Sequence, residues 1–239
     1  MKKLDQLRKK IDIIDDKILK LLQNRSKLAL DIGSLKNKNS KSSNLYRPER
    51  QAKILSRLFL KKSSLFNEKD IFNFWKEIFF HQTTLQGSID FLIPENLKKL
   101  EKKIIFDALG NNIIFKTYKN FPNASSKIKD NNNKFLILPF PGKTKKADWW
   151  ISKHFKDLFV ISAIPFVCKN KSIPKLVVVS KNKPILEGDC SCLYVSPILI
   201  KDEKLKKINY FKSHYLYRST NLLNYNKLKF LGAYPNLKI

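Results

Sequence analysis

The sequence predicts two parts: three helices over residues 1–90, followed by an α/β domain of modest size over residues 91–239. Hydrophobic residues recur at alternating steps of three and four from residue 4 to residue 35, which is helical spacing. After residue 110, short apolar runs replace that pattern, which is typical of strands. No run approaches the roughly 18–20 apolar residues that a membrane span needs, so no membrane partner is expected.

The first helix is expected to span residues 4–36 and to be unusually long. A helix of about 33 residues measures about 50 Å, which exceeds a compact domain, so it needs a partner along its length. Its apolar positions form a heptad seam that only Arg25 interrupts. The seam consists of Leu4, Leu7, Ile11, Ile14, Ile18, Leu21, Leu28, Ile32 and Leu35.

Two further helices complete the N-terminal part. The second is expected to begin near residues 47–48, because proline suits the first turn of a helix. The third is expected to begin after Asn67, an N-cap residue that two acidic residues follow. Its apolar stripe continues to Ile89, but Gln82 and Gln86 stand where apolar residues are expected.

The second part is expected to open with a helix over 94–109 that ends before Gly110. Strands are then predicted at 113–118, 135–140, 158–167, 175–180, 192–200, 214–219 and 228–234. Short helices are predicted near 123–129, 148–155 and 202–208.

The chain carries a net charge of +28, but this charge does not single out nucleic acid as the partner. The basic residues are 42 lysines and six arginines spread along the chain, which resembles a coding bias toward lysine. Arginine is therefore the informative cation, because its planar fork grips carboxylates and phosphates. Five of the six lie in the first 57 residues, where we expect the chemistry: Arg8, Arg25, Arg47, Arg50 and Arg57.

Cysteine and histidine usage predicts neither a metal site nor a disulfide framework. The three cysteines lack paired C-x-x-C motifs and are interpreted as reduced thiols, and the three histidines are scattered. The first 17 residues alternate charged and apolar residues, without the apolar core of a secretory signal, so a cytoplasmic protein is expected.

Polar residues on the apolar faces of the helices indicate a binding site. Arg25, Ala29 and Lys36 lie on one face of the first helix, with the two cations about 16 Å apart along its axis. The small Ala29 leaves a hollow between them, which Gln82 and Gln86 of the third helix are expected to face. Buried cations without acidic partners are costly, and a small dianion would compensate them. The alternative is that these cations pair with acids or extend to solvent.

Three motifs resemble the all-helical chorismate mutase family, of the kind that many bacteria fuse to prephenate dehydratase or prephenate dehydrogenase. They are the opening L-R-x-x-I-D-x-I-D, the later R-x-x-L-A-x-x-I-G-x-x-K, and R-P-E-R, and the resemblance covers residues 3–88. It implies rearrangement of chorismate to prephenate without a metal or cofactor. It also implies an intertwined homodimer whose long first helices pack across the two-fold axis.

The resemblance assigns catalytic roles to three residues. Arg25 and Lys36 would bind the carboxylates and the ether oxygen of chorismate, and Gln86 would donate a hydrogen bond to that oxygen. Arg8 would enter the site from the other chain of the dimer. Gly33, one turn before Lys36, is expected to relieve crowding where two helices cross.

The resemblance also places three residues around the rest of the substrate. Arg50 would order or contact the ligand, and Gln82 would lie near a carboxylate. Gln51 stands where the family usually has a glutamate for the ring hydroxyl, and glutamine can still accept that hydrogen bond. Two more positions depart from the family pattern, because Arg47 replaces a common aspartate and Gln82 a smaller residue.

The second part resembles prephenate dehydratase weakly, and its tail from residue 190 resembles the ACT regulatory fold faintly. The positions of the catalytic Thr-Arg-Phe motif of the dehydratase are taken here by Ile173, Pro174 and Lys175, or in the neighbouring register by Pro174, Lys175 and Leu176. We therefore expect a degenerate domain without dehydratase activity, with a structural or ligand-sensing role.

Three other functions remain open from the sequence. Isochorismate-pyruvate lyase shares the helical fold and much of the site. A catalytically inactive ligand-binding protein is the second alternative. A basic nucleic-acid-binding protein is the least favoured, because arginine and aromatic residues do not interleave along one track.

Overall fold

The computed structural model describes residues 2–39, 44–141, 147–168 and 173–238. Three helices come first and confirm the expected order. In α3 the Asn67 side chain accepts hydrogen bonds from two backbone N–H groups, so the predicted N-cap is confirmed. The helices are α1 (Lys2–Asn39), α2 (Pro48–Phe59) and α3 (Glu68–Gln86).

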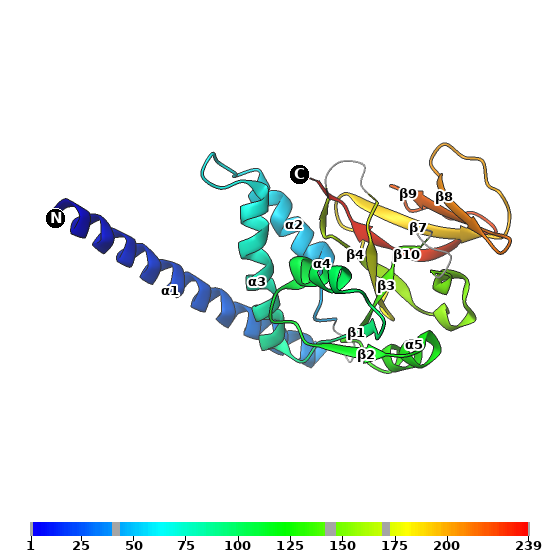
Figure 1. The fold of residues 1–239 in the computed structure, drawn as a ribbon, viewed down its shortest axis with the longest axis horizontal. Coiled ribbons are helices and arrows are strands. Elements are labelled where there is room, and N and C mark those ends of the chain that lie inside the picture. Colours follow the sequence, from blue (N-terminus) through cyan, green and yellow to red (C-terminus); the bar gives the residue numbers. More distant parts are fainter. Residues whose placement is uncertain (1, 40–43, 142–146, 169–172, 239) are drawn as a thin grey trace.

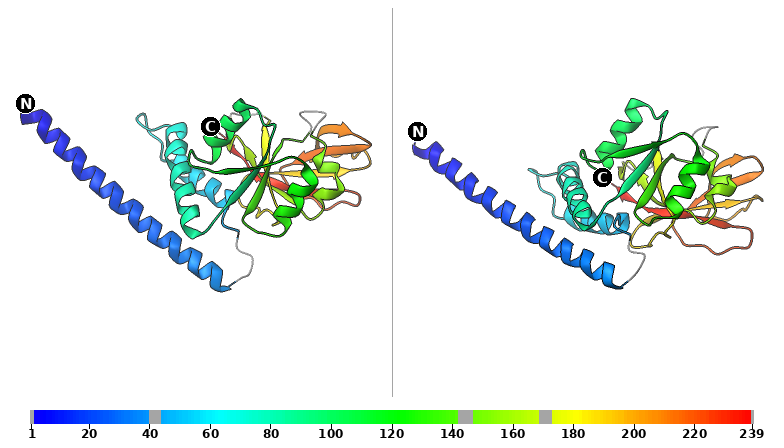
Figure 2. Two further views of the ribbon diagram at one scale, coloured as in Figure 1. Left: turned by 60° about the horizontal axis from the view of Figure 1, so that its bottom comes forward. Right: turned by 90° about the horizontal axis from the view of Figure 1, so that it is seen from below.

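Helix α1 projects from the body of the molecule. Its C-terminal end lies against α3, while its N-terminal half stands apart from every other element in all three views (Figures 1 and 2). The large apolar side chains of its seam are consequently exposed to solvent in the single chain. Ile18, for example, is 49% exposed and Leu21 is 67% exposed. The partner expected along this seam stays a prediction.

The rest of the chain is built on one nine-stranded mixed sheet, in the order β2-β1-β3-β6-β4-β10-β7-β9-β8. Strands β2, β1 and β3 are parallel, whereas β10, β7, β9 and β8 form an antiparallel half. The strands are β1 (Asp90–Pro94), β2 (Phe115–Tyr118), β3 (Lys134–Pro139), β4 (Phe159–Ile164), β6 (Leu176–Ser180), β7 (Cys190–Ser196), β8 (Lys206–Phe211), β9 (His214–Ser219) and β10 (Lys229–Pro235). A separate pair joins β5 (Val167–Cys168) to β11 (Leu237–Lys238).

Two strands of the nine-stranded sheet, β1 and β8, were not predicted from the sequence. Strand β1 was not predicted, and because it runs through Pro94 the following helix α4 (Lys99–Leu109) starts later than expected, although it ends before Gly110 as predicted. The helix expected near 202–208 is wrong, because β8 occupies residues 206–211. Its two leading lysines, Lys206 and Lys207, suit a strand at the exposed edge of a sheet, where pairing with β9 decides the conformation.

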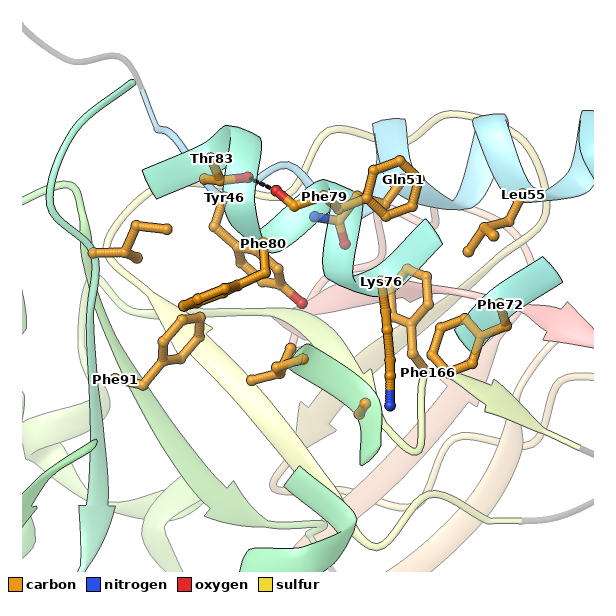
Figure 3. Close-up of a pocket in the computed structure, with 13 residues that line it drawn as sticks. Tyr46, Gln51, Leu55, Phe72, Lys76, Phe79, Phe80, Thr83, Phe91 and Phe166 are labelled. Carbon is orange, nitrogen blue, oxygen red and sulfur yellow. Dashed lines mark hydrogen bonds between the residues drawn. The ribbon is translucent and has the colours of Figure 1, made fainter. Parts of the chain in front are cut away.

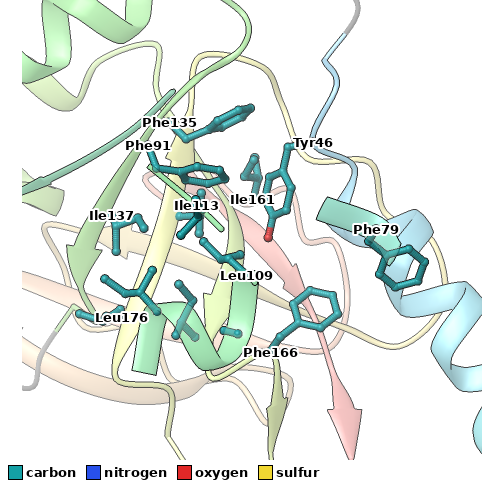
Figure 4. Packing of buried hydrophobic residues seen from close by; sticks show 14 of the residues in the cluster. Tyr46, Phe79, Phe91, Leu109, Ile113, Phe135, Ile137, Ile161, Phe166 and Leu176 are labelled. Carbon is teal, nitrogen blue, oxygen red and sulfur yellow. The ribbon is translucent and has the colours of Figure 1, made fainter. Parts of the chain in front are cut away.

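Helices cover both faces of the sheet. Residues of α2, α3 and α4 pack on one face, and α5 (Phe121–Lys129) with the 3₁₀ turns η1 (Trp149–Ile151) and η2 (Lys153–Phe155) lies on the other. The first face forms one hydrophobic cluster with Tyr46, Phe91 and Phe135 near its centre (Figure 4). The predicted helical part and the predicted α/β part therefore share a core.

The two halves of the sheet meet at Gly232. Its φ of +131° is disfavoured for other residues, and a Cβ there would lie 2.2 Å from the carbonyl oxygen of Val160 on β4. Glycine is therefore required where β10 approaches β4.

Two further findings concern properties expected from composition. Within the described residues, no helix is long and apolar enough to cross a membrane. Cys190 and Cys192 are free thiols, as expected, whereas the side chain of Cys168 lies outside the described residues.

Candidate functional site

A pocket of about 430 Å³ opens where α1 crosses α3 beside the first turn of α2. Five of the seven predicted site residues line it: Arg25, Arg50, Gln51, Gln82 and Gln86. The other lining residues are Leu28, Ala29, Ile32, Leu45, Arg47, Ile54, Phe79 and Thr83.

Small residues on α1 allow the close crossing with α3. Ala29 is buried, and a Cβ added to Gly33 would lie 3.1 Å from Cγ of Gln86. This contact confirms that Gly33 relieves crowding at a helix crossing. It also sets the position from which Gln86 reaches the pocket.

Arg25 enters the pocket from α1 with its charge uncompensated by any described residue. Its Cζ atom lies 5.7 Å from the centroid of the Phe79 ring, within cation–π range. Burial, and secondarily the nearby charge of Arg50, lower the pKa of the Arg25 guanidinium. None of the ion pairs between described residues involves either arginine. The pair therefore favours an anion between them.

A third arginine in the pocket is already neutralised. Arg47 forms an ion pair with Glu49, whose side chain is only 7% exposed. Sequence reasoning noted Arg47 as a departure from a family pattern and did not place it in the pocket wall. It also missed Leu45 and Thr83, which carry no periodicity or charge signal.

The two glutamines of α3 line the pocket one turn apart. Gln82 is 5% exposed, and its backbone carbonyl accepts a hydrogen bond of 3.1 Å from Nε2 of Gln86. Oε1 of Gln86 is buried without a hydrogen-bond partner among the described residues. An unsatisfied buried polar atom costs about 1–3 kcal/mol, and this one is an acceptor that a ligand hydroxyl would satisfy. Donation to a ligand would fall to the second N–H of Gln86 Nε2, because the first is bonded to the Gln82 carbonyl.

The family of the helical part follows from comparison with known proteins. Residues 7–87 match the family model of chorismate mutase type II. These residues form a chorismate mutase type II domain. The mutase domain takes in nearly all of α1, α2 and α3, and every residue that lines the pocket lies within it.

Two solved structures are similar to the chain at low sequence identity. One, titled "GqqA- a novel type of quorum quenching acylases", is 9% identical over 62% of this chain and 96% of its own, with a TM-score of 0.42. The other is the prephenate dehydratase from Streptococcus mutans, 10% identical over 64% of this chain and 100% of its own, with a TM-score of 0.39. Comparison with curated proteins finds no match.

Two predicted site residues of the mutase domain, Arg8 and Lys36, are not among the described residues that line the pocket. Arg8 is on the exposed part of α1, about 25 Å along the helix from Arg25, and its guanidinium lies 3.6 Å from Asp5. It does not reach the pocket of its own chain. Lys36 belongs to α1, but its side chain lies outside the described residues.

The described wall of the mutase pocket is cationic and holds no acidic residue. The Thr83 hydroxyl is occupied, because it donates a hydrogen bond of 2.6 Å to the Phe79 carbonyl. Arginine and amide groups form strong hydrogen bonds to carboxylates. The pocket can therefore bind and orient a small dianion.

Proposed function

We propose that the protein is a cytoplasmic chorismate mutase, which rearranges chorismate to prephenate in the biosynthesis of phenylalanine and tyrosine. The observation that carries this proposal is the gathering of Arg25, Arg50, Gln82 and Gln86 in one pocket without an acidic residue. Chorismate bears two carboxylates, which such a wall would hold.

The rearrangement needs orientation and charge stabilisation rather than a nucleophile. As the C–O bond breaks ahead of C–C bond formation, negative charge builds on the ether oxygen. Gln86 and Lys36 would meet this charge with hydrogen bonds in a preorganised site. Arg25 would grip a carboxylate and hold the reacting chain over the ring. Gln51 would accept a hydrogen bond from the ring hydroxyl, and no metal or cofactor takes part.

The proposal includes a homodimer in which a second copy covers α1. The seam of α1 exposes a continuous row of large apolar residues, which a monomer rarely leaves bare. A heptad seam is the pattern of helices that pack along their length. The partner chain would supply Arg8, because the Arg8 of the same chain is too far away along α1.

Residues 91–239 would form a domain without dehydratase chemistry. Ile173, Pro174 and Lys175 offer neither the hydroxyl nor the guanidinium of the Thr-Arg-Phe motif. The purified protein should therefore fail to convert prephenate to phenylpyruvate, and such conversion would refute this part of the proposal.

The deciding experiment follows the loss of chorismate absorbance with the purified protein. Arg25→Ala and Lys36→Ala should each lower kcat/KM about 100-fold or more, which is typical for removing one group that stabilises developing charge. Arg57→Ala is the matched control, because Arg57 is exposed in the last turn of α2 and outside the pocket. It should keep wild-type turnover.

The three alternative functions predict different results when the same purified protein is tested with other substrates and ligands. Release of pyruvate from isochorismate, without chorismate turnover, would identify the lyase. A folded protein that binds chorismate without converting it would be a sensor. Salt-sensitive binding of DNA or RNA would favour the nucleic-acid-binding hypothesis. In that case Arg25→Ala should weaken this binding and affect nothing else.

A further inference from the structure

Residues 45–47, directly before α2, take part in both halves of the molecule. Leu45 and Arg47 line the mutase pocket, whereas Tyr46 between them is 4% exposed and lies in the core over the sheet. Its ring makes edge contacts with Phe91 of β1 and Phe135 of β3, at centroid distances of 5.6 and 5.4 Å (Figure 4). A buried aromatic ring with such neighbours is a strong anchor.

Two hydrogen bonds fasten the same segment to the α/β region. The backbone N–H of Leu45 donates to Oδ1 of Asn133 at 3.0 Å, and the hydroxyl of Tyr46 donates to Oγ of Ser162 on β4 at 3.3 Å. Asn133 is itself held beside the sheet, because its carbonyl accepts from the N–H of Asp90. The backbone of a pocket-lining residue is thus bonded to a residue outside the mutase domain.

The back of the pocket is also the contact surface with the sheet. A narrow cavity of about 20 Å³ lies between α2, α3 and the sheet, beside Tyr46 and Phe91 (Figure 3). Gln51, Phe79 and Thr83 line both this cavity and the mutase pocket. Because these residues are packed between the sheet and the pocket, a displacement of the sheet would also move the pocket wall that is proposed to bind the substrate.

We propose that the α/β region positions the mutase pocket through a latch made of Leu45, Tyr46, Asn133 and Ser162. The latch fixes the segment that carries Leu45 and Arg47, so that the pocket is preorganised before the substrate binds. Asn133 is a positioning residue in this view. The inference rests on the proposed function for its effect on turnover, but the latch itself can be observed without substrate.

The test uses the full-length protein and the variants Asn133→Ala and Asn133→Asp. Asn133→Ala removes the acceptor of the Leu45 N–H, and we expect kcat/KM for chorismate to fall about tenfold, since small misplacements in a site cost 10²-fold or less. Asn133→Asp keeps an oxygen acceptor and should restore turnover. Hydrogen exchange at the Leu45 amide should be faster in Asn133→Ala and near wild-type in Asn133→Asp.

Asn236→Ala is the matched control for a general loss of stability. The Asn236 side chain bonds to Ser191 and Asp189 within the α/β region and lies outside the latch. The Asn236→Ala substitution removes the same kind of side chain as Asn133→Ala. It should leave both kcat/KM and hydrogen exchange at the Leu45 amide unchanged.

The outcomes separate the latch from the proposed function. Equal turnover in Asn133→Ala and wild type would overturn the positioning role, and so would an equal loss in Asn236→Ala. If the wild type does not convert chorismate, the proposed function fails and Leu45 exchange alone decides on the latch. In that case, faster exchange only in Asn133→Ala supports it and unchanged exchange overturns it.

Discussion

The amide of Gln86 lies at the point where helix packing and pocket chemistry meet. One N–H is bonded to the Gln82 carbonyl, and the oxygen has no partner among the described residues. An amide can donate at any pH, whereas a carboxyl group donates only when it is protonated. In the proposed site, the identity of residue 86 would therefore set how turnover responds to pH.

Gln86→Glu should make the proposed activity dependent on acid. Near neutral pH the carboxylate cannot donate to the ether oxygen, so kcat/KM should fall about 100-fold and recover as the pH drops toward about 5. Measurement of kcat/KM across this range checks the expectation. Gln51→Glu makes the same chemical change in the same pocket and should show no such dependence, because residue 51 would accept a hydrogen bond. A loss that is equal at every pH would contradict the assigned role of Gln86.

Gly33→Ala should separate stability from turnover. Alanine favours the helix by about 1 kcal/mol over glycine, but its Cβ presses on Gln86 at 3.1 Å. We expect the melting temperature to hold or rise while kcat/KM falls about fivefold, as Gln86 moves away from its place. Ser34→Ala, at an exposed neighbouring position, is the control that should leave kcat/KM unchanged. Equal turnover in Gly33→Ala would show that the crossing tolerates a methyl group.

At the scale of one element, α1 combines two demands in a single helix. Its C-terminal end must carry Arg25 into the pocket, and its N-terminal half presents apolar residues that no described residue of the same chain covers. A helix of this length therefore has an incomplete environment in one chain. The proposed second copy would complete it.

Ile14→Lys should break the proposed dimer. Ile14 is 53% exposed in the single chain and lies on the seam, where a buried lysine would be costly without a partner. Sedimentation should show a monomer, and turnover should fall because Arg8 of the partner no longer reaches the pocket. Asp16→Lys adds the same side chain off the seam and should stay dimeric. A wild-type protein that sediments as a monomer would refute the dimer itself.

At the scale of the whole molecule, the mutase domain and the α/β region share one hydrophobic cluster. Leu55 of α2 and Phe135 of β3 are both fully buried in it, and Tyr46 joins them. A shared core couples the stability of the parts that build it. Residue 90 is thus a boundary in sequence pattern rather than a break in packing.

We expect thermal unfolding in a single transition. Circular dichroism, dominated by the helices, and the fluorescence of Trp149 and Trp150 beyond the sheet should give the same midpoint. Because Trp75 lies in α3, both are measured in a Trp75→Phe background. Leu55→Ala should lower the free energy of unfolding by about 2–5 kcal/mol and shift both probes together. Leu60→Ala, at a position 88% exposed, should shift neither. Two separate midpoints would show that the parts unfold independently.

Sequence periodicity predicted the elements that have strong local patterns. It failed for strands whose conformation depends on pairing with a strand distant in sequence. The heptad seam, the proline at the start of α2 and the Asn67 cap are local signals, so α1, α2 and α3 were predicted in place. Strand β1 is a five-residue strand between helices that begins with Asp90, and β8 is an edge strand that begins with two lysines. Both become strands because partners pair with them, and a partner distant in sequence leaves no local signal.

The sequence by itself determined the three helices, the α/β character of the rest, and most of the pocket, because Arg25, Gln82 and Gln86 break apolar stripes whose geometry is local. The tertiary structure alone decided that Leu45 and Arg47 join the wall and that Asn133 and Tyr46 tie the pocket to the sheet. These relations depend on how distant segments pack together, and a helical or strand period carries no information about which distant segments will meet.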